Sequence, residues 1–357
     1  MNLLDLTPVD AGRTLDEWLH GRGPGFRARQ ILPRLWSRPV ASWEDATDLP
    51  KALRAELEAA FPLPRLTLAT SQISRDGTRK FLWKLPDGAA VESVLIPEGK
   101  RRTLCISSQA GCAYGCVFCA TGRMGFGRHL APWEITGQVR EMALDPEIGK
   151  PTNIVFMGMG EPLHNWAGVD RSLTILNDPG GLGIGARHIT VSTVGLIPEL
   201  AKLAARTEQF RLALSLHAPT HEQRLSIMPV ERKYPLDAVL VALRAFSRRV
   251  TFEYVMIRGM NDRPADADTL ARIAQPLGAL VNLLPLHPGG TPGLVPTPAA
   301  DMRDFAARLE ELGVAATVRR SRGLDIDAAC GQLRVAFEGR GEVAADQDAG
   351  IEEPLGI

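Results

Sequence analysis

Residues 103–119, TLCISSQAGCAYGCVFC, decide the fold and contain four of the five cysteines of the chain. An apolar run typical of a buried strand leads into a loop in which Cys112, Cys116 and Cys119 have the spacing C-x3-C-x2-C. Three thiolates on one short loop can bind three irons of a [4Fe-4S] cluster. The fourth iron then has no protein ligand, so the spacing predicts a cluster with an open substrate site rather than an electron-transfer centre.

From about residue 101 onward, apolar runs alternate with stretches whose spacing suits helices, such as WEITGQVREMAL and IPELAKLAAR. This alternation predicts an α/β fold, because successive strands of a parallel sheet need crossover helices. Six βα units suit a partial barrel or an open doubly wound sheet, and both bind ligands at the carboxyl ends of their strands. The six strand-like runs are TLCISS, NIVFMGM, HITVST, FRLALSL, VTFEYVMI and LVNLLPL.

Candidate ligand-binding residues follow several of these strands, and we expect them to meet at one rim of the fold. In the segment GMGE at residues 158–161, glycines let a ligand approach the backbone and the carboxylate can balance a ligand ammonium group. The segment lacks the third glycine of a dinucleotide fingerprint, so it does not indicate a Rossmann site. The rim positions are Gly160, Glu161, Ser192, Ser215, Leu216, His217 and His287.

The rest of the chain divides around this core. Residues 1–75 contain three stretches with helical apolar spacing, which predict a small helical unit suited to docking. Residues 76–100 alternate in a strand-like way on both sides of a Pro-Asp-Gly turn, which predicts a β extension. The core should then span residues 101–340, and residues 341–357, with five acids and no base, should form a disordered tail.

The composition is that of an ordinary globular chain of 357 residues, of which 45% are hydrophobic and 23% charged. Basic and acidic residues number 41 each, so net charge alone indicates no nucleic-acid partner. Basic clusters at residues 100–102 and 319–322 can meet phosphates, although a solvated charged surface explains them as well. The sequence has neither an export signal nor a long apolar stretch, so we expect a cytoplasmic protein without membrane contact.

Five cysteines in such a chain are better explained as metal ligands or catalytic thiols than as a disulfide framework. The alternative to an iron–sulfur cluster is a zinc site completed by His129 or Cys105, although zinc sites usually pair one C-x2-C with a second, distant pair. Cys105 and Cys330 lie outside the triplet, and each taken separately reads as a small buried hydrophobic residue. Glu92, in AVESVLIP, likewise reads as a charge beside a strand.

The segment CAYGCVFC resembles the cluster motif of the radical S-adenosylmethionine superfamily, in which the open iron binds S-adenosylmethionine (SAM). Longer segments resemble the RlmN/Cfr family of RNA methyltransferases, from FRARQIL near the N-terminus to Gln332 and Leu333. This resemblance implies a partial (β/α)6 radical-SAM barrel with a small N-terminal helical domain and a short β extension. The segments that carry it are TLCISSQAGCAYGCVFCATG, VFMGMGEPL, LALSLHAPTHEQR, SIMPVERKYPL and RSRGLDIDAACGQL.

The resemblance implies methylation of adenosine at C2, a ring carbon too electrophilic to attack a methylsulfonium directly. In the family, one SAM methylates the downstream cysteine, here Cys330, and a second is cleaved by the reduced cluster to a 5′-deoxyadenosyl radical. That radical takes hydrogen from the S-methyl group, and the resulting methylene radical adds to C2. Cys105 is then the thiol that releases Cys330 as a disulfide, and Glu92 accepts the C2 proton.

The resemblance also assigns contacts and partners. Gly160 and Glu161 contact the methionine amino group of SAM, and Ser192 and residues 215–217 contact the rest of the ligand. His287 stands where the family usually has asparagine, and imidazole offers fewer hydrogen bonds than an amide. The implied substrates are 23S rRNA and tRNA, the implied electron donor is external, such as flavodoxin, and we expect a monomer.

Other functions fit parts of the pattern. A protein of the Cfr type would methylate C8 of adenosine in 23S rRNA, although Glu161-Pro162 and Pro285 resemble the C2 branch. A glycyl-radical activase or a methylthiotransferase, or another radical SAM enzyme that modifies RNA, would keep the cluster triplet without needing both Cys105 and Cys330. A non-catalytic RNA-binding module would hold zinc and be colourless, whereas an iron–sulfur protein is brown.

Overall fold

A ten-stranded sheet forms the framework of the molecule, and the computed structural model describes residues 1–22, 24 and 26–333. The strand order is β1-β2-β3-β4-β7-β8-β9-β10-β11-β12, with antiparallel pairs from β1 to β4 and parallel pairs from β4 to β12. The strands are β1 (Thr67–Ile73), β2 (Arg79–Lys84), β3 (Ala90–Glu98), β4 (Arg101–Cys105), β7 (Asn153–Phe156), β8 (Ile189–Thr193), β9 (Arg211–Ser215), β10 (Thr251–Met256), β11 (Leu280–Pro285) and β12 (Ala316–Val318).

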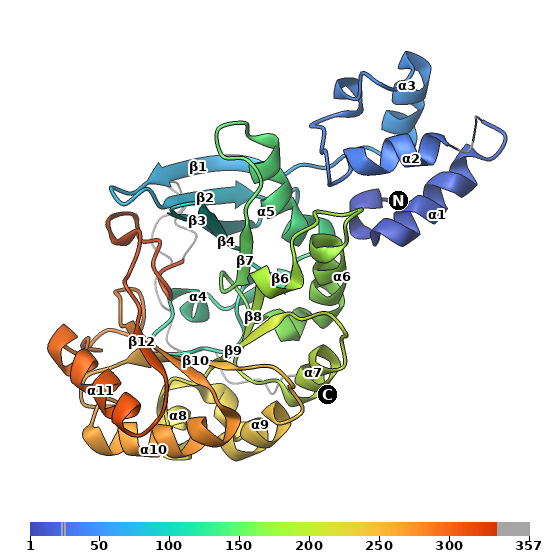
Figure 1. Ribbon diagram of the computed structural model, residues 1–357. Coiled ribbons are helices and arrows are strands. Elements are labelled where there is room, and N and C mark those ends of the chain that lie inside the picture. The colour runs from blue at the N-terminus through green and yellow to red at the C-terminus, as the bar shows by residue number, and fades with distance from the viewer. Residues whose placement is uncertain (23, 25, 334–357) are drawn as a thin grey trace, which may run out of the picture.

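Helices connect the parallel strands and lie around the outside of the curved sheet (Figure 1). The α-helices are α1 (Pro8–Leu19), α2 (Arg27–Ile31), α3 (Lys51–Ala60), α4 (Ala120–Arg123), α5 (Pro132–Leu144), α6 (Trp166–Asn177), α7 (Ile197–Ala204), α8 (His221–Ile227), α9 (Leu236–Leu243), α10 (Pro264–Ala274) and α11 (Ala299–Glu311). Short 3-10 helices are η1 (Leu3–Asp5), η2 (Leu32–Arg34), η3 (Trp43–Asp45), η4 (Pro162–Asn165), η5 (Ala186–His188), η6 (Pro229–Arg232), η7 (Gln275–Leu277) and η8 (Leu324–Ile326).

The parallel part of the sheet confirms the six strands expected from the apolar runs, as β4 and β7 to β11. Their central residues, such as Ile154, Val191, Leu212 and Phe252, are at most 1% exposed. Strands covered by protein on both faces need apolar side chains throughout, which explains the continuous runs. The fold is therefore a partial (β/α)6 barrel, extended at one edge by β12, which pairs with β11.

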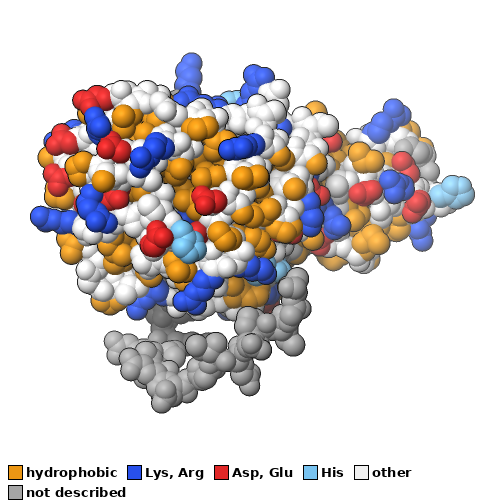
Figure 2. Space-filling model, turned by 90° about the horizontal axis from the view of Figure 1, so that it is seen from below, with side chains coloured by type: hydrophobic (Ala, Val, Ile, Leu, Met, Phe, Trp, Pro, Cys, Tyr) orange, Lys and Arg blue, Asp and Glu red, His pale blue; other side chains and the backbone are white. Residues whose placement is uncertain are grey.

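A small lobe of three helices precedes the sheet and projects from one side of the main body (Figures 1 and 2). Trp36 and Trp43 form its core and are fully buried. The lobe is fixed to the barrel by Arg140 of α5, whose guanidinium donates to the carbonyls of Leu35 at 2.9 Å and Val40 at 2.5 Å. These hydrogen bonds join segments about a hundred residues apart in the sequence.

Some elements differ from the expectation. β1 begins at Thr67, ahead of the β extension expected from residue 76, and its residues are all exposed. The loop that carries the cysteine triplet is flanked by a hairpin of β5 (Gln109–Gly111) and β6 (Phe126–His129), which the apolar pattern did not reveal. Within the described residues, no helix is both long and apolar enough to cross a membrane. The expected acidic tail, residues 341–357, lies outside the described residues.

Candidate active site

The cysteine loop, residues 112–119, crosses the open end of the barrel between β5 and α4. Its first residue is fixed to the hairpin because the amide of Cys112 donates to the carbonyl of Gly125 at 2.8 Å. A Cβ atom on Gly111, whose φ is +79°, would lie 2.0 Å from that carbonyl oxygen. Only glycine therefore fits at the entrance of the loop.

The middle of the cysteine loop is bound by two other segments that follow barrel strands. The amide of Val117 donates to the carbonyl of Ile227 at 3.0 Å, and the amide of Thr291 donates to the carbonyl of Val117 at 2.6 Å. The ring of Phe118 packs edge-on against His217, with 4.5 Å between the ring centroids. Loops after β9 and β11 thus hold the three cysteines at the barrel mouth.

The three thiols of the loop suit a shared, positively charged group. Burial raises the pKa of Cys112 to about 12 and the pKa of Cys116 well above its ordinary value, and negative charge on Cys119 raises the pKa of Cys116 further. Buried thiolates need a nearby cation, which iron supplies in a cluster. Every cysteine of the chain is a free thiol, so all three are available as ligands. The donor set therefore fits the predicted cluster.

The zinc alternative fits less well. A single zinc ion needs its ligands within about 2.3 Å of one point. No group of three or more His, Cys, Asp or Glu side chains among residues 1–22, 24 and 26–333 is arranged to hold one metal ion. His129 instead accepts a hydrogen bond at Nδ1 from the side-chain amide of Gln109 at 2.9 Å, and Cys105 lies on β4 near Cys330. Thiolates of a cubane cluster bind separate irons, so this limit does not apply to them.

Gly158 and Gly160, in the segment after β7, are required by packing inside the protein. A Cβ atom on Gly158 would lie 2.7 Å from the backbone of Ile106, and one on Gly160 would lie 2.5 Å from Cβ of Gln109. Gly160 also has a φ of +97°, which favours glycine. These glycines therefore bring the segment against Ile106, just after β4, and against the β5–β6 hairpin, a packing role beside the close approach by a ligand that the sequence predicted.

Glu161 is buried beside the cysteine loop. Its two carboxylate oxygens accept hydrogen bonds from the amides of Leu163 at 2.9 Å and Val194 at 2.8 Å. Burial nevertheless raises the pKa of this carboxyl to about 7. Its charge in turn raises the pKa of Cys112, so the two groups are electrostatic neighbours. A carboxylate held in this way can accept a further hydrogen bond from a ligand ammonium group.

A row of polar side chains crosses the inside of the barrel. Ser192 and Ser215, at the ends of β8 and β9, lie with their hydroxyl oxygens 3.4 Å apart. Ser215, Glu253 and Asn282 are register partners on three neighbouring strands, and the Asn282 amide donates to Glu253 at 3.0 Å. The row continues the line of rim positions that the sequence predicted at Ser192 and Ser215.

His217 is buried and neutral. Its Nδ1 accepts a hydrogen bond from the amide of Val255 at 3.0 Å, which leaves the ring proton on Nε2. Burial, together with the charge of Arg224, lowers the pKa of this imidazole to about 3. The amides of Leu216 and His217 both donate to the carbonyl of Glu253, so this turn is fixed against β10. His217 has a φ of +57°, a left-handed conformation that is unusual for a residue other than glycine.

His287, at the end of β11, contacts a different partner. Its Nε2 lies 2.8 Å from the hydroxyl of Ser321, and burial lowers the pKa of the ring. Ser321 leads into the Cys330 loop, residues 323–333. The imidazole of His287 thus contacts the segment that precedes the Cys330 loop. The sequence did not suggest this contact.

The Cys330 loop is anchored on the β extension. The hydroxyl of Ser74 donates to Asp325 at 2.5 Å, and the amide of Gly323 donates to Asp76 at 3.0 Å. Lys80 of β2 donates to the carbonyl of Asp327 at 3.3 Å. The tip of the β1–β2 hairpin and strand β2 therefore hold one side of the loop.

The other side of the Cys330 loop is anchored just after the cysteine loop. The amide of Ala120 donates to the carbonyl of Gly331 at 2.8 Å, and the hydroxyl of Thr121 donates to the carbonyl of Leu333 at 2.7 Å. These contacts bring Cys330 next to the triplet, and charge on Cys119 raises the pKa of Cys330.

Cys330 and Cys105 lie near enough for the charge of one thiol to affect the other. Cys330 is exposed, and the protein atoms packed around its thiol raise the pKa of that group. Burial raises the pKa of Cys105 far above its ordinary value, and negative charge on Cys330 adds to this effect. The structure thus brings together the two cysteines outside the triplet. Cys105 is 9% exposed, whereas Cys330 is among the exposed residues.

Glu92 lies on β3 and is 3% exposed, so it is a buried acid and not a charge at the rim. Its carboxylate forms an ion pair with Lys80, with Nζ and Oε1 3.5 Å apart. Its backbone carbonyl accepts a hydrogen bond from Ser107, which follows β4. These contacts place Glu92 between the β extension and the first strand of the barrel.

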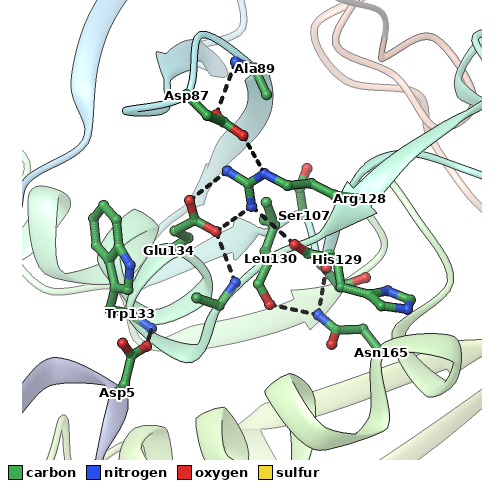
Figure 3. A network of polar contacts seen from close by, with 12 residues as sticks. Asp5, Asp87, Ala89, Ser107, Arg128, His129, Leu130, Trp133, Glu134 and Asn165 are labelled. Carbon is green, nitrogen blue, oxygen red and sulfur yellow. Dashed lines mark hydrogen bonds and ion pairs between the residues drawn. The ribbon is translucent and has the colours of Figure 1, made fainter. Parts of the chain in front are cut away.

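A polar network braces the hairpin beside the cysteine loop (Figure 3). Arg128 of β6 donates to Asp87 at 2.5 Å and to both carboxylate oxygens of Glu134 at 2.7 and 2.8 Å. The Asn165 amide donates to the carbonyls of Ser108 at 2.9 Å and Leu130 at 2.8 Å. The β2–β3 turn, α5 and the segment after β7 are thereby joined around the hairpin.

Sequence reasoning missed several residues of this region. Glu253 was open to detection, because an acid inside the otherwise apolar run VTFEYVMI is unusual for a buried strand. Lys80 and Gln109 gave no such signal, since their partners are brought close only by the strand pairing and the loop packing. Arg224, which is fully buried against Glu231, lies in a segment that was noted only for its resemblance.

A partial (β/α)6 barrel with a three-cysteine loop at its mouth defines the radical SAM class of enzymes. Residues 106–270 match the family model described as the radical SAM superfamily. A solved structure described as a radical SAM methyltransferase from Sphaerobacter thermophilus superposes with a TM-score of 0.87 at 42% identity, covering 94% of this chain and 99% of that one. Membership of this class implies a [4Fe-4S] cluster and SAM.

The chain belongs to the RlmN family of dual-specificity RNA methyltransferases. It is 56% identical over 351 residues to a probable dual-specificity RNA methyltransferase RlmN of Gemmatimonas aurantiaca, covering 98% of this chain and 97% of that protein. It is 48% identical over 322 residues to a dual-specificity RNA methyltransferase RlmN of Anaeromyxobacter dehalogenans, covering 86% of each.

Proposed function

We propose that the protein methylates C2 of adenosine in 23S rRNA and in tRNA and that Cys330 carries the methyl group. The observation that carries this proposal is the placement of the Cys330 loop. Backbone hydrogen bonds hold it against residues 120 and 121, directly after the cysteine triplet, and the charge of Cys330 reaches Cys105 on β4. A radical SAM enzyme that only starts a radical needs the triplet alone. Two further thiols at the same place support a reaction in which the protein itself is methylated and then released.

Cys112, Cys116 and Cys119 would hold the cluster, and Glu161, Ser192 and Ser215 would hold SAM. When bound, the cluster and SAM supply the methyl group and the radical that activates the methylated cysteine. Glu161 offers its carboxylate to the ligand ammonium, and the serine hydroxyls offer one donor and acceptor each. The residues around them exclude bulk water, since Glu161 and Ser192 are 3% and 8% exposed.

Three residues of the chain take part in the later steps. Cys330 becomes joined to the adenine through the carbon of its S-methyl group, which bonds to C2, and Glu92 accepts the proton that leaves C2. Cys105 then forms a transient disulfide with Cys330 as the carbon–sulfur bond breaks. The proximity of the two thiols and the burial of Glu92 support these roles.

We extend the proposal to 23S rRNA and tRNA as substrates, to an external electron donor such as flavodoxin, and to a monomeric enzyme. The relatives are named as RNA methyltransferases, which supports RNA as the substrate. The helical lobe, fixed beside the barrel, is the part of the chain that we assign to docking RNA.

The proposal predicts that Cys330 is found methylated. Anaerobically reconstituted enzyme is incubated with SAM bearing a deuterated methyl group, and its peptides are analysed by mass spectrometry. We expect the deuterated methyl or methylene mass on the peptide that contains Cys330, and no such mass on Cys105. A Cys330→Ser variant is the control, and it should bind the cluster but leave C2 of the RNA unmethylated. A wild-type enzyme that methylates RNA without ever labelling Cys330 contradicts the proposal.

A further inference from the structure

We propose that Lys80 is the positioning residue of the proton-transfer step, because its ammonium group contacts both the Glu92 carboxylate and the backbone of the Cys330 loop. The inference rests on the proposed role of Glu92 as the proton acceptor. It adds to that role a second residue, which lies on the neighbouring strand β2.

The pairing of β2 with β3 brings the two side chains together. Leu82 is the register partner of Glu92, and Lys80 is the register partner of Val94, so Lys80 and Glu92 are diagonal neighbours on one face of the hairpin. Long side chains reach across such a diagonal. The ammonium nitrogen and the carboxylate oxygen lie 3.5 Å apart, and the side chains are only 12% and 4% exposed.

The same ammonium group also holds the Cys330 loop. It donates to the carbonyl of Asp327 at 3.3 Å, three residues before the cysteine. Asp327 has a φ of +50°, and its carboxylate accepts a hydrogen bond from the Gln332 amide at 3.2 Å. Lys80 therefore sits at the junction between the proton acceptor and the loop that carries the adduct.

Charge explains why this junction needs a lysine. A carboxylate taken out of water is costly by several kcal/mol unless an opposite charge accompanies it. In the proton-transfer step, the C2–H bond breaks, its electron pair stays on the adenine ring, and the proton passes to Glu92. The carboxylate must be unprotonated and correctly oriented beforehand. A neutral side chain at position 80 removes this ion pair, so the Glu92 carboxylate loses the contact that orients it toward the Cys330 loop.

The test uses the reconstituted holoenzyme with SAM, reductant and tRNA, in wild-type form and as Lys80→Met, Lys80→Arg and Lys84→Met. Lys84 is the matched control, since it lies on the same strand but is exposed. Methylation of Cys330 is measured by peptide mass, and the covalent RNA–protein adduct is measured on denaturing gels. Cys105→Ala serves as the reference for a trapped adduct.

For Lys80→Met, we expect Cys330 to be methylated at the wild-type rate while resolution of the adduct slows by about 100-fold, the scale of lost general-base catalysis. The adduct therefore accumulates, as in Cys105→Ala. Lys80→Arg keeps the positive charge and should restore resolution to within about tenfold of the wild type. Lys84→Met should resolve the adduct normally.

The outcomes separate this inference from the function on which it rests. If Glu92→Gln traps the adduct while Lys80→Met resolves it normally, the role of Lys80 is wrong and the role of Glu92 stands. If Glu92→Gln also resolves the adduct normally, Glu92 is not the proton acceptor and both assignments fail. Loss of Cys330 methylation in Lys80→Met would also overturn the inference. Lys80 would then be needed for the conformation of the Cys330 loop and not specifically for the proton transfer.

Discussion

At the scale of the residue, His217 joins two unusual properties, a left-handed backbone and an imidazole that burial keeps neutral. Its pKa is lowered from the ordinary 6.5 to about 3, so between these values the folded protein binds fewer protons than the unfolded chain. The stability that the neutral ring contributes is fully present above pH 6.5 and is lost as the pH falls toward 3.

We therefore predict that His217→Asn makes the free energy of unfolding less dependent on pH. Asparagine tolerates the left-handed conformation and has no titrating ring. Urea unfolding of the wild type and the variant at pH 7 and pH 5 measures the effect. The wild type should lose about 1–2 kcal/mol more than the variant over this interval, since one pKa unit corresponds to about 1.4 kcal/mol. Equal losses would show that the ring is protonated in the folded protein.

Single residues were predicted from the sequence where their chemistry is specific. The cysteine triplet and the Gly-Glu pair after β7 were expected, and the structure places them side by side at the barrel mouth. Lys80 was not expected, because a lysine in a strand is ordinarily solvated and only the register of β2 against β3 directs it to Glu92. The packing role of Gly158 and Gly160 was also missed, since it depends on neighbours about fifty residues away, such as Ile106.

At the scale of the element, α8 and η6 are joined by a buried ion pair. The guanidinium of Arg224 contacts the Glu231 carboxylate, and both side chains are fully buried. Arg224 also donates to the carbonyl of Val194 at 2.7 Å, and Glu231 accepts from the amide of Leu236 at 2.7 Å. The pair thus fixes the segment after β9, which supports the cysteine loop through Ile227.

Removal of one partner should be costly, because the other charge remains buried. We predict that Arg224→Met lowers the free energy of unfolding by about 3–5 kcal/mol. The control is Lys202→Met, which removes a surface ion pair with Glu199 and should cost at most about 0.5 kcal/mol. Chemical denaturation of the two variants measures both values. A loss in Arg224→Met as small as that of the control would contradict a structural role for the pair.

Elements were predicted from the sequence where burial imposes a pattern. The six parallel strands are covered on both faces, so their apolar runs were visible. β1 is exposed throughout and β12 has three residues, so neither has an apolar run. The β5–β6 hairpin was hidden because it is stabilised by glycine-dependent close approach and by Arg128, and not by alternating apolar residues.

At the scale of the whole molecule, Arg140 fixes the helical lobe to the barrel. Its buried guanidinium donates to two carbonyls of the lobe, and burial lowers its pKa to about 10. We predict that Arg140→Met leaves those carbonyls unpaired and lowers the free energy of unfolding by about 2–4 kcal/mol. Urea unfolding measures the loss, and limited proteolysis reports whether the lobe has separated. Arg13→Met, which removes an exposed ion pair with Asp10, is the control and should behave like the wild type.

The contact between Thr121 and Leu333 joins positions that are 212 residues apart. During synthesis the chain emerges from its N-terminus, and the parts made first fold first. The lobe, the β extension and the cysteine loop are therefore complete long before Cys330 leaves the ribosome. A nascent chain can form the loop of the three cysteines while it still lacks Cys330, so the two parts of the site come together only after the last strand of the described sheet, β12, has been made.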